Sequence, residues 1–383
     1  MTIHWCGTGL SSVPGLRSLI EAGRPVTVWN RTAEHARDAV GDITGDIRAY
    51  SLDRLRAALS PGDVAVSMLP ADHHVAIASA CLEVGANFVS SSYIAPAMRA
   101  LDERFRKAGL VSQNEVGLDP GIDHLMAHDL VGRYRASAAA HPANEIAFTS
   151  YCGGIPKNPN PFRYKFSWAP AGVLRALRSP ARALVEFQTR EVARPWHAVS
   201  EYVAPLPHPE TFEVYPNRDS LPFMAEYAFD PAWKVREFVR GTLRLKGWKE
   251  AWAPVFATIE SLDGMSQPEA DARIETLAGE LVEKNAYAPG EPDRVVLFVT
   301  LAARRDGRAV FHESWAMDAW GDARGSAMAR LVSGMVAMAV ESVLAGEITP
   351  GVHSAPRDAA TLNRWLGRVH PLAQHLERVD HLA

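Results

Sequence analysis

The chain has 383 residues, with 40 Lys and Arg against 44 Asp and Glu, which gives a formal net charge of −4. Hydrophobic residues make up 47% and charged residues 22%, a composition that is typical of folded globular proteins and excludes a disordered chain. The near-neutral charge argues against general affinity for nucleic acids, which requires a positive surface. The length predicts two or three domains.

The cysteines and the apolar runs indicate the cellular compartment. Cys6, Cys81 and Cys152 are odd in number and far apart, a pattern that favours a reducing compartment over a disulfide-bonded secreted domain. The first residues lack the basic and apolar segments of a signal peptide, and no apolar run is long and clean enough to span about 30 Å of hydrocarbon. We therefore expect a soluble, cytoplasmic protein.

The first 115 or so residues alternate short apolar strands with amphipathic helices. The expected strands are Thr2–Cys6, Pro25–Trp29, Asp63–Leu69, Asn87–Ser91 and Gly109–Gln113. The expected helices are Val13–Ala22, Ala33–Val40, Leu52–Leu59, His73–Val84 and Pro96–Ala108. This alternation predicts an α/β fold with a doubly wound parallel sheet and helices on both faces.

The pattern changes after about residue 145. Longer strands are expected at Glu145–Tyr151, Thr211–Tyr215, Arg294–Arg304 and Arg308–Met317, the last two joined by an Asp306-Gly307 hairpin turn. The region 151–231, rich in Pro and aromatic residues, is expected to contain much ordered loop. Helices are expected at Lys234–Val239, Glu250–Leu262, Glu269–Lys284 and about Ser326–Leu344.

A glycine-containing loop follows the first expected strand. Gly7 and Gly9 would let the backbone turn tightly and approach a pyrophosphate, together with Leu10 and Ser11, at the start of the next helix. Ser12 takes the place of the third glycine of the usual dinucleotide fingerprint, so the alternative of a plain strand–helix turn stays open. The position of the loop within a βαβ unit favours nucleotide binding.

The end of the second expected strand indicates which nucleotide is bound. An NAD-specific site usually has an acidic residue there, whereas this chain has Asn30, Arg31 and Thr32. A cation and two hydrogen-bonding side chains suit the 2′-phosphate of NADP, although tolerance of NAD stays open.

The segment Asn114-Glu115-Val116-Gly117-Leu118-Asp119-Pro120-Gly121-Ile122-Asp123-His124 resembles the saccharopine dehydrogenase family, in particular its NADP-dependent, L-glutamate-forming branch. Further blocks that match in order are Ser91-Ser92-Tyr93, Ser150–Gly154, Tyr164–Trp168, Tyr215–Ser220 and Arg240–Arg244. The chain departs from the family at Ser12, in the loop after Gly154 and in a seemingly shorter helical region.

The resemblance implies a domain plan. It implies a Rossmann domain of residues 1–118 and about 325–383, and an α+β substrate and dimerisation domain of residues 119–231 and about 289–324. Residues 232–288 would form a helical closing domain, and the protein would be a homodimer.

The resemblance also implies the reaction, which interconverts saccharopine with L-glutamate and 2-aminoadipate 6-semialdehyde by hydride transfer with NADP. Which direction runs in lysine metabolism stays open. The substrate has three carboxylates, and the planar fork of arginine matches a carboxylate with two hydrogen bonds. The implied substrate contacts are Ser92, Tyr93, Asp119, Arg218, Thr242, Leu243 and Arg244. A salt bridge between Arg218 and Asp219 is the structural alternative for the first arginine.

The implied proton-transfer candidates are Asp119, Tyr93 and Cys152, and His124 was also considered. Asp119 could instead cap the following helix, and Cys152 could be an inert core residue. Further implied cofactor contacts are Ser67, Leu69, Pro70, Leu118, Pro120, Gly121 and His124.

Two histidine groups raise the question of a metal. Asp72-His73-His74 and the pair His124 and His128 have no evident third ligand, so we expect no metal. Three other functions stay open: a related reductase of polyamine Schiff bases of the carboxynorspermidine type, a non-catalytic NADP-binding protein, and a metal hydrolase.

Overall fold

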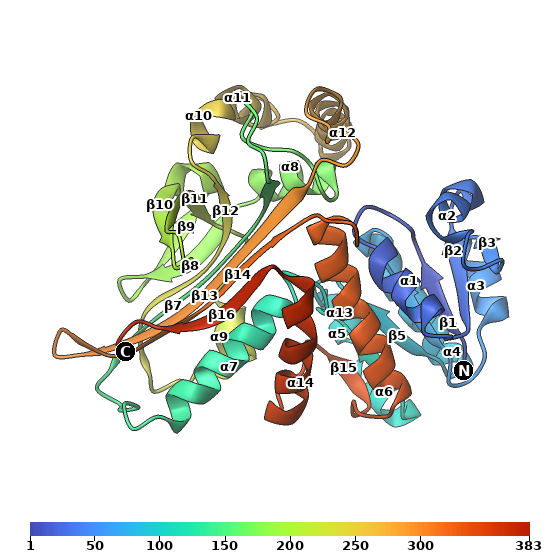
Figure 1. Ribbon diagram of the computed structural model, residues 1–383, viewed down its shortest axis with the longest axis horizontal. Helices are drawn as coiled ribbons and strands as arrows, with labels where there is room; N and C mark the ends of the chain where they lie inside the picture. Colours follow the sequence, from blue (N-terminus) through green and yellow to red (C-terminus); the bar gives the residue numbers. More distant parts are fainter. The chain divides into compact units, whose positions relative to one another are not determined.

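The computed structural model describes all residues from Met1 to Ala383, and they form two compact units. Unit 1 comprises Met1–Leu125 and Ala323–Leu372, and unit 2 comprises Met126–Asp322 and Ala373–Ala383 (Figure 1). The chain therefore leaves unit 1, builds most of unit 2 and returns.

Unit 1 contains a seven-stranded sheet in the order β15-β6-β5-β4-β1-β2-β3, and all of its neighbouring strands are parallel. The strands are β1 (Ile3–Cys6), β2 (Val26–Asn30), β3 (Ile47–Ala49), β4 (Val64–Ser67), β5 (Asn87–Ser90), β6 (Val111–Gln113) and β15 (Gly351–His353). The strand order reverses at β1, between β2 and β4. In a doubly wound sheet, ligands bind beyond the carboxyl ends of the strands at this reversal.

The helices of unit 1 connect these strands. They are α1 (Val13–Glu21), α2 (Ala33–Val40), α3 (Leu52–Ala58), α4 (His74–Val84), α5 (Pro96–Arg99), α6 (Asp102–Ala108), α13 (Ala327–Leu344), α14 (Ala359–Val369) and the first residues of α7 (Ile122–Ala136), with short 3₁₀ turns at Ala71–His73 and His370–Leu372.

Helix α13 is long and apolar enough to cross a membrane by length and composition alone, but 78% of it is buried. It packs against α1 and against β4 and β5 (Figure 1). Packing within unit 1 therefore accounts for its apolar composition.

Unit 2 is built on a nine-stranded sheet, seven of whose strands run in the order β10-β11-β12-β7-β13-β14-β16, while β8 pairs with β12 and β9. The strands are β7 (Glu145–Pro156), β8 (Ala181–Val185), β9 (Gln188–Val192), β10 (Ser200–Ala204), β11 (Glu210–Pro216), β12 (Lys234–Leu245), β13 (Asp293–Arg305), β14 (Arg308–Trp320) and β16 (His375–Asp380). Strands β7 and β12 are parallel, and the other pairs are antiparallel.

The helices of unit 2 are the rest of α7, α8 (Pro170–Arg178), α9 (Pro222–Glu226), α10 (Trp248–Ala251), α11 (Ala253–Glu260) and α12 (Gln267–Lys284), with a 3₁₀ turn at Pro195–Ala198. Helices α8, α11 and α12 enclose an aromatic-rich core that includes Tyr164, Trp248 and Trp252. This core lies in the same unit as the long sheet.

The α/β fold class and the doubly wound parallel sheet are confirmed. The expected helix at Lys234–Val239 is wrong, because these residues open strand β12. A register shift between Val235 and Glu237 breaks the alternation of the strand, so that its buried positions Val235, Phe238 and Val239 imitate helical spacing.

The two compact units divide the chain differently from the expected domains. Residues 373–383 were expected in the Rossmann domain, but β16 pairs with β14 and belongs to unit 2. Unit 1 continues to Leu125, beyond the expected limit at residue 118, and the expected helical closing domain, residues 232–288, falls within unit 2. The expected loop region 151–231 contains the β8–β9 hairpin and β10. Strand pairing at long sequence separation decides these limits, and local patterns do not record it.

Candidate functional site

The loop after β1 has the geometry of a phosphate site. Gly7 has a φ of 103°, and a Cβ atom there would lie 3.0 Å from the carbonyl oxygen of Met68, so this position requires glycine. Around Gly9, nothing lies within 4 Å of the position that a Cβ would take. The Oγ1 atom of Thr8 is buried without a hydrogen-bond partner. Open space beside an unsatisfied hydroxyl, at the start of α1, fits a pyrophosphate.

Ser12, which replaces the third glycine, is a structural support of this loop. Its hydroxyl accepts a hydrogen bond from Trp5 Nε1 at 2.8 Å and donates one to the carbonyl oxygen of Gly7 at 2.6 Å. The close packing that the third glycine usually permits occurs at Gly15, where a Cβ would lie 2.0 Å from the backbone oxygen of Ser333 in α13. Sequence reasoning missed Gly15, although a glycine on the buried face of α1 was a usable signal.

Gly15→Ala should therefore lower the free energy of unfolding of unit 1 by about 2–3 kcal/mol, because the added methyl group collides with backbone rather than with a flexible side chain. Urea titration of the purified protein measures this change. Gly9→Ala is the matched control, since its methyl group has free space in the protein and would instead compete with a bound nucleotide. A Gly9→Ala protein that lost as much stability as Gly15→Ala would contradict this assignment.

The end of β2 presents an unpaired cation. Asn30 is held by a hydrogen bond from its Nδ2 to the backbone oxygen of Thr32 at 2.9 Å. Arg31 is exposed and makes no ion pair within the chain. Its guanidinium is therefore available to an anionic ligand, and no acidic side chain at this strand end opposes it.

A buried histidine links the ends of β4 and β5. His74 lies 2.9 Å through Nδ1 from Ser67 Oγ and 2.8 Å through Nε2 from Ser92 Oγ. Burial lowers the pKa of His74 to about 4, so its imidazole is neutral near physiological pH. Ser67 is fully buried, whereas Leu69 is partly exposed and Pro70 is exposed.

Two of the proton-transfer candidates meet in unit 1. The hydroxyl of Tyr93, which follows β5, donates a hydrogen bond to Asp119 Oδ1 at 2.9 Å. Both residues are partly exposed. At the first turn of α7, Asp123 accepts from the backbone N–H of Gly121 at 2.7 Å, as a helix-capping carboxylate does. Asp119 accepts the hydrogen bond from Tyr93, and its alternative role as a helix cap stays open.

A buried network holds the segment that carries Asp119. Glu115 accepts a hydrogen bond from the backbone N–H of Ile94 at 2.8 Å, and its second oxygen lies 2.9 Å from His124 Nε2. The other ring nitrogen of His124, Nδ1, lies 3.4 Å from Asp123 Oδ2. His124 is fully buried and helps to hold the loop, and the cofactor contact predicted for it stays open. Leu118, Pro120 and Gly121 are also buried.

Strand β12 of unit 2 carries two of the predicted substrate contacts on one face. Thr242 and Arg244 are two residues apart and share a face, whereas the side chain of Leu243 points to the other face and is fully buried in a separate core. Leu243 could therefore reach a ligand on the Thr242 face only through its backbone. Cys152 of β7 is the parallel-strand neighbour of Thr242 and is 9% exposed.

Arg244 is a buried cation without an internal counter-ion. It is 4% exposed, and its guanidinium carbon lies 4.9 Å from the ring centre of Tyr164, 5.6 Å from that of Tyr215 and 5.5 Å from that of Trp248. One N–H donates to the backbone oxygen of Leu243 at 3.1 Å, while Nε has no partner. Burying an unneutralised charge is costly. The aromatic box therefore suits an external carboxylate.

Arg218 follows β11 and is exposed, with a φ of 54°. The salt bridge with Asp219 that was considered for it is replaced by another pair. Arg182 donates to one carboxylate oxygen of Asp219 at 3.1 Å and to the other at 2.5 Å. Asp219 is thus paired with Arg182, and the carboxylate-binding prediction for Arg218 stays open.

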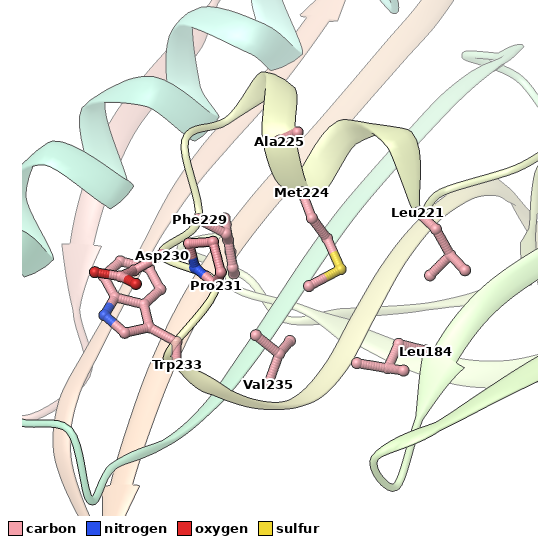
Figure 2. Close-up of a pocket in the computed structure, with 9 residues that line it drawn as sticks. All are labelled: Leu184, Leu221, Met224, Ala225, Phe229, Asp230, Pro231, Trp233 and Val235. Atoms are coloured by element: carbon pink, nitrogen blue, oxygen red, sulfur yellow. The ribbon is translucent and has the colours of Figure 1, made fainter.

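No cluster of three or more possible metal ligands is present. An apolar cavity of about 400 Å³ opens in unit 2, between α9 and the start of β12 (Figure 2). Its lining includes Met224, Phe229, Trp233 and Val235. None of the predicted site residues lines this cavity.

Two family models together match most of the chain. A family model described as "Saccharopine dehydrogenase NADP binding domain" matches residues 7–112, and one described as "Saccharopine dehydrogenase C-terminal domain" matches residues 117–371. A saccharopine dehydrogenase [NADP(+), L-glutamate-forming] of Pyricularia oryzae is 34% identical over 270 residues, which cover 68% of this chain and 58% of that protein. The mitochondrial alpha-aminoadipic semialdehyde synthase of Rattus norvegicus is 28% identical, over 77% of this chain and 38% of that protein. The chain thus spans less than two thirds of the length of these relatives.

Solved structures share the fold. The apo saccharopine dehydrogenase (L-Glu forming) of Saccharomyces cerevisiae superimposes with a TM-score of 0.79 at 26% identity, over 99% of each chain. A homospermidine synthase of Legionella pneumophila, in complex with NAD, has a TM-score of 0.65 at 10% identity. The second likeness concerns the fold alone.

Proposed function

Because this chain belongs to the saccharopine dehydrogenase family of NAD(P)-binding oxidoreductases, we propose that it interconverts saccharopine with L-glutamate and 2-aminoadipate 6-semialdehyde, using NADP. The observation that carries the proposal is Arg244, a buried guanidinium without a counter-ion inside an aromatic box. A substrate with three carboxylates supplies the missing negative charge.

In this proposal, unit 1 binds the cofactor. The residues at Gly7, Thr8 and Gly9 would hold the pyrophosphate, and Arg31 would bind the 2′-phosphate. A bound nicotinamide cofactor supplies the hydride acceptor or donor. Thr8 and Gly9 fit this group, because one offers an unsatisfied buried hydroxyl and the other leaves open space.

Tyr93 and Asp119 are assigned the proton transfers. The phenol donates to the carboxylate, which therefore acts as an acceptor and can take a proton from the secondary amine of saccharopine or from the water that attacks the imine. In the reductive direction the same pair returns that proton. Arg244 and Arg218 would bind the carboxylates of the substrate. Thr242 and Ser92 would form neutral hydrogen bonds to it. We also propose that the protein is a homodimer and that its substrate is this tricarboxylate amino acid.

Steady-state kinetics with saccharopine, comparing NADP with NAD by nicotinamide absorbance, tests the proposed function. We expect turnover with saccharopine and a preference for NADP. Preferential turnover of diamine-derived Schiff bases would favour the polyamine reductase instead. Calorimetric binding of NADP without turnover of any amine would favour the non-catalytic binding protein.

Arg31→Asp should raise the KM for NADP about 10- to 100-fold, because it replaces a charge-assisted hydrogen bond to the 2′-phosphate by charge repulsion. The KM for NAD, which lacks this phosphate, should change much less. Arg24→Asp, which makes the same charge change in the loop before β2, is the control. Equal effects of Arg31→Asp on the two cofactors would contradict the assignment.

A further inference from the structure

Ser67, His74 and Ser92 form a hydrogen-bonded triad, and the surroundings of its side chains determine which of them donates each hydrogen bond. All three side chains meet beyond the carboxyl ends of β4 and β5, and His74 is held from the side by an edge contact with Phe88 at 6.1 Å between ring centres. Ser92 is fixed further by its backbone N–H, which donates to Ser90 Oγ at 3.1 Å. The positions are thus set by the sheet, and only the protons are left to be assigned.

A neutral imidazole has one N–H, so it donates to one serine and accepts from the other. Ser67 is fully buried, and the only hydrogen-bond partner of its hydroxyl is His74 Nδ1. The hydroxyl proton of Ser67 is therefore satisfied only if Ser67 donates to Nδ1. The opposite arrangement leaves a buried O–H without an acceptor, which is unfavourable.

The position of the imidazole proton follows. Because Nδ1 accepts from Ser67, the single N–H of His74 is on Nε2 and donates to Ser92 Oγ. The hydroxyl of Ser92 then serves as acceptor toward His74, and its own proton points to another partner. Ser92 Oγ has no other partner in the chain, and the residue is partly exposed. A ligand at this surface therefore meets a hydrogen-bond donor.

We propose that His74 is a positioning residue that, through the buried hydroxyl of Ser67, makes Ser92 a donor toward an anionic oxygen of the ligand. That this oxygen is a carboxylate of saccharopine rests on the proposed function. A donor at Ser92 favours a carboxylate and disfavours a protonated amine. The Ser67–His74–Ser92 triad thereby contributes to substrate specificity, since it disfavours the binding of diamines at Ser92.

The first test observes the proton directly. NMR of nitrogen-labelled histidine at neutral pH, with the His74 signals assigned by their loss in His74→Gln, should show the proton on Nε2. In Ser67→Ala this preference should weaken to a mixture of the two tautomers. A proton on Nδ1 in the wild type, or an unchanged tautomer in Ser67→Ala, would overturn the proposal.

The second test measures the consequence for binding. Ser67→Ala removes one fully buried hydroxyl oxygen, and it should raise the KM for saccharopine about 3- to 10-fold while changing kcat less. Ser112→Ala is the matched control, because Ser112 is a fully buried serine in β6 of the same sheet that does not belong to the Ser67–His74–Ser92 triad. A purely structural role of Ser67 would give equal effects in the two variants and would overturn the proposal.

Two conservative variants of His74 keep the proposal testable if Ser67→Ala fails to fold. The amide of Gln can reach the place of Nε2 and donate to Ser92, whereas that of Asn reaches only the place of Nδ1. His74→Gln should therefore retain a lower KM for saccharopine than His74→Asn, and the reverse order would count against the proposal. If the wild type does not turn over saccharopine, the proposed function fails, and the tautomer measurements alone decide on the role of His74.

Discussion

Arg244→Met should raise the KM for saccharopine at least about 100-fold while changing the free energy of unfolding by no more than about 1 kcal/mol. The loss of binding is large because Arg244 is only 4% exposed, so its guanidinium would pair with a carboxylate out of contact with water. The small effect on stability follows from the absence of an internal counter-ion. Methionine keeps apolar contact with the box of Tyr164, Tyr215 and Trp248, and no carboxylate is left unpaired.

Arg294→Met provides the contrast within the same unit. Arg294 donates to both oxygens of Asp318 at 2.7 Å and also lies 2.8 Å from Glu210. Its loss would leave Asp318, which is 8% exposed, without its partner, and should cost about 3–5 kcal/mol of stability. Urea unfolding of both variants, with saccharopine kinetics of Arg244→Met, makes the comparison. If Arg244→Met destabilises the protein as Arg294→Met does, Arg244 is a structural cation and the proposed substrate clamp is wrong.

Asp119→Asn should lower kcat about 100- to 10,000-fold, the range expected when a positioned general base is lost. The amide preserves the size of the side chain and can still accept from the Tyr93 hydroxyl, so the geometry of the segment should persist. NADP binding, measured by calorimetry, should stay close to that of the wild type. The pH profile of kcat/KM should lose the limb that reports the base.

Tyr93→Phe and the double variant complete this experiment. Because Tyr93 and Asp119 are in direct contact at 2.9 Å, their effects on kcat should not be additive. Additive losses would show that the two side chains act in separate steps. An Asp119→Asn protein with more than half of the wild-type kcat would limit Asp119 to a structural role in the loop.

Local patterns predicted much of unit 1. Strands β1, β2, β4 and β5 and helices α1 to α4 lie within a residue or two of their expected limits, since each carries a short apolar run or an amphipathic face bounded by turn residues. The glycine loop and the neighbouring residues Asn30 and Arg31 at the end of β2 were also visible, because phosphate binding depends on residues that are adjacent in the chain. The hairpin at Asp306-Gly307 was found for the same reason, as both residues have the positive φ that this turn requires.

The sequence by itself therefore determined the fold class, the nucleotide loop and the motif residues, all of which depend on neighbours in the chain. Only the tertiary structure decided which groups pair. It placed β16 in the sheet of unit 2, gave Asp219 to Arg182 and left Arg244 without a counter-ion. It also connected Ser67, His74 and Ser92 by hydrogen bonds and placed Gly15 against Ser333. The physical reason is that burial and hydrogen-bond partnership arise between residues far apart in sequence, and their energies depend on which groups are left unsatisfied once the chain has packed.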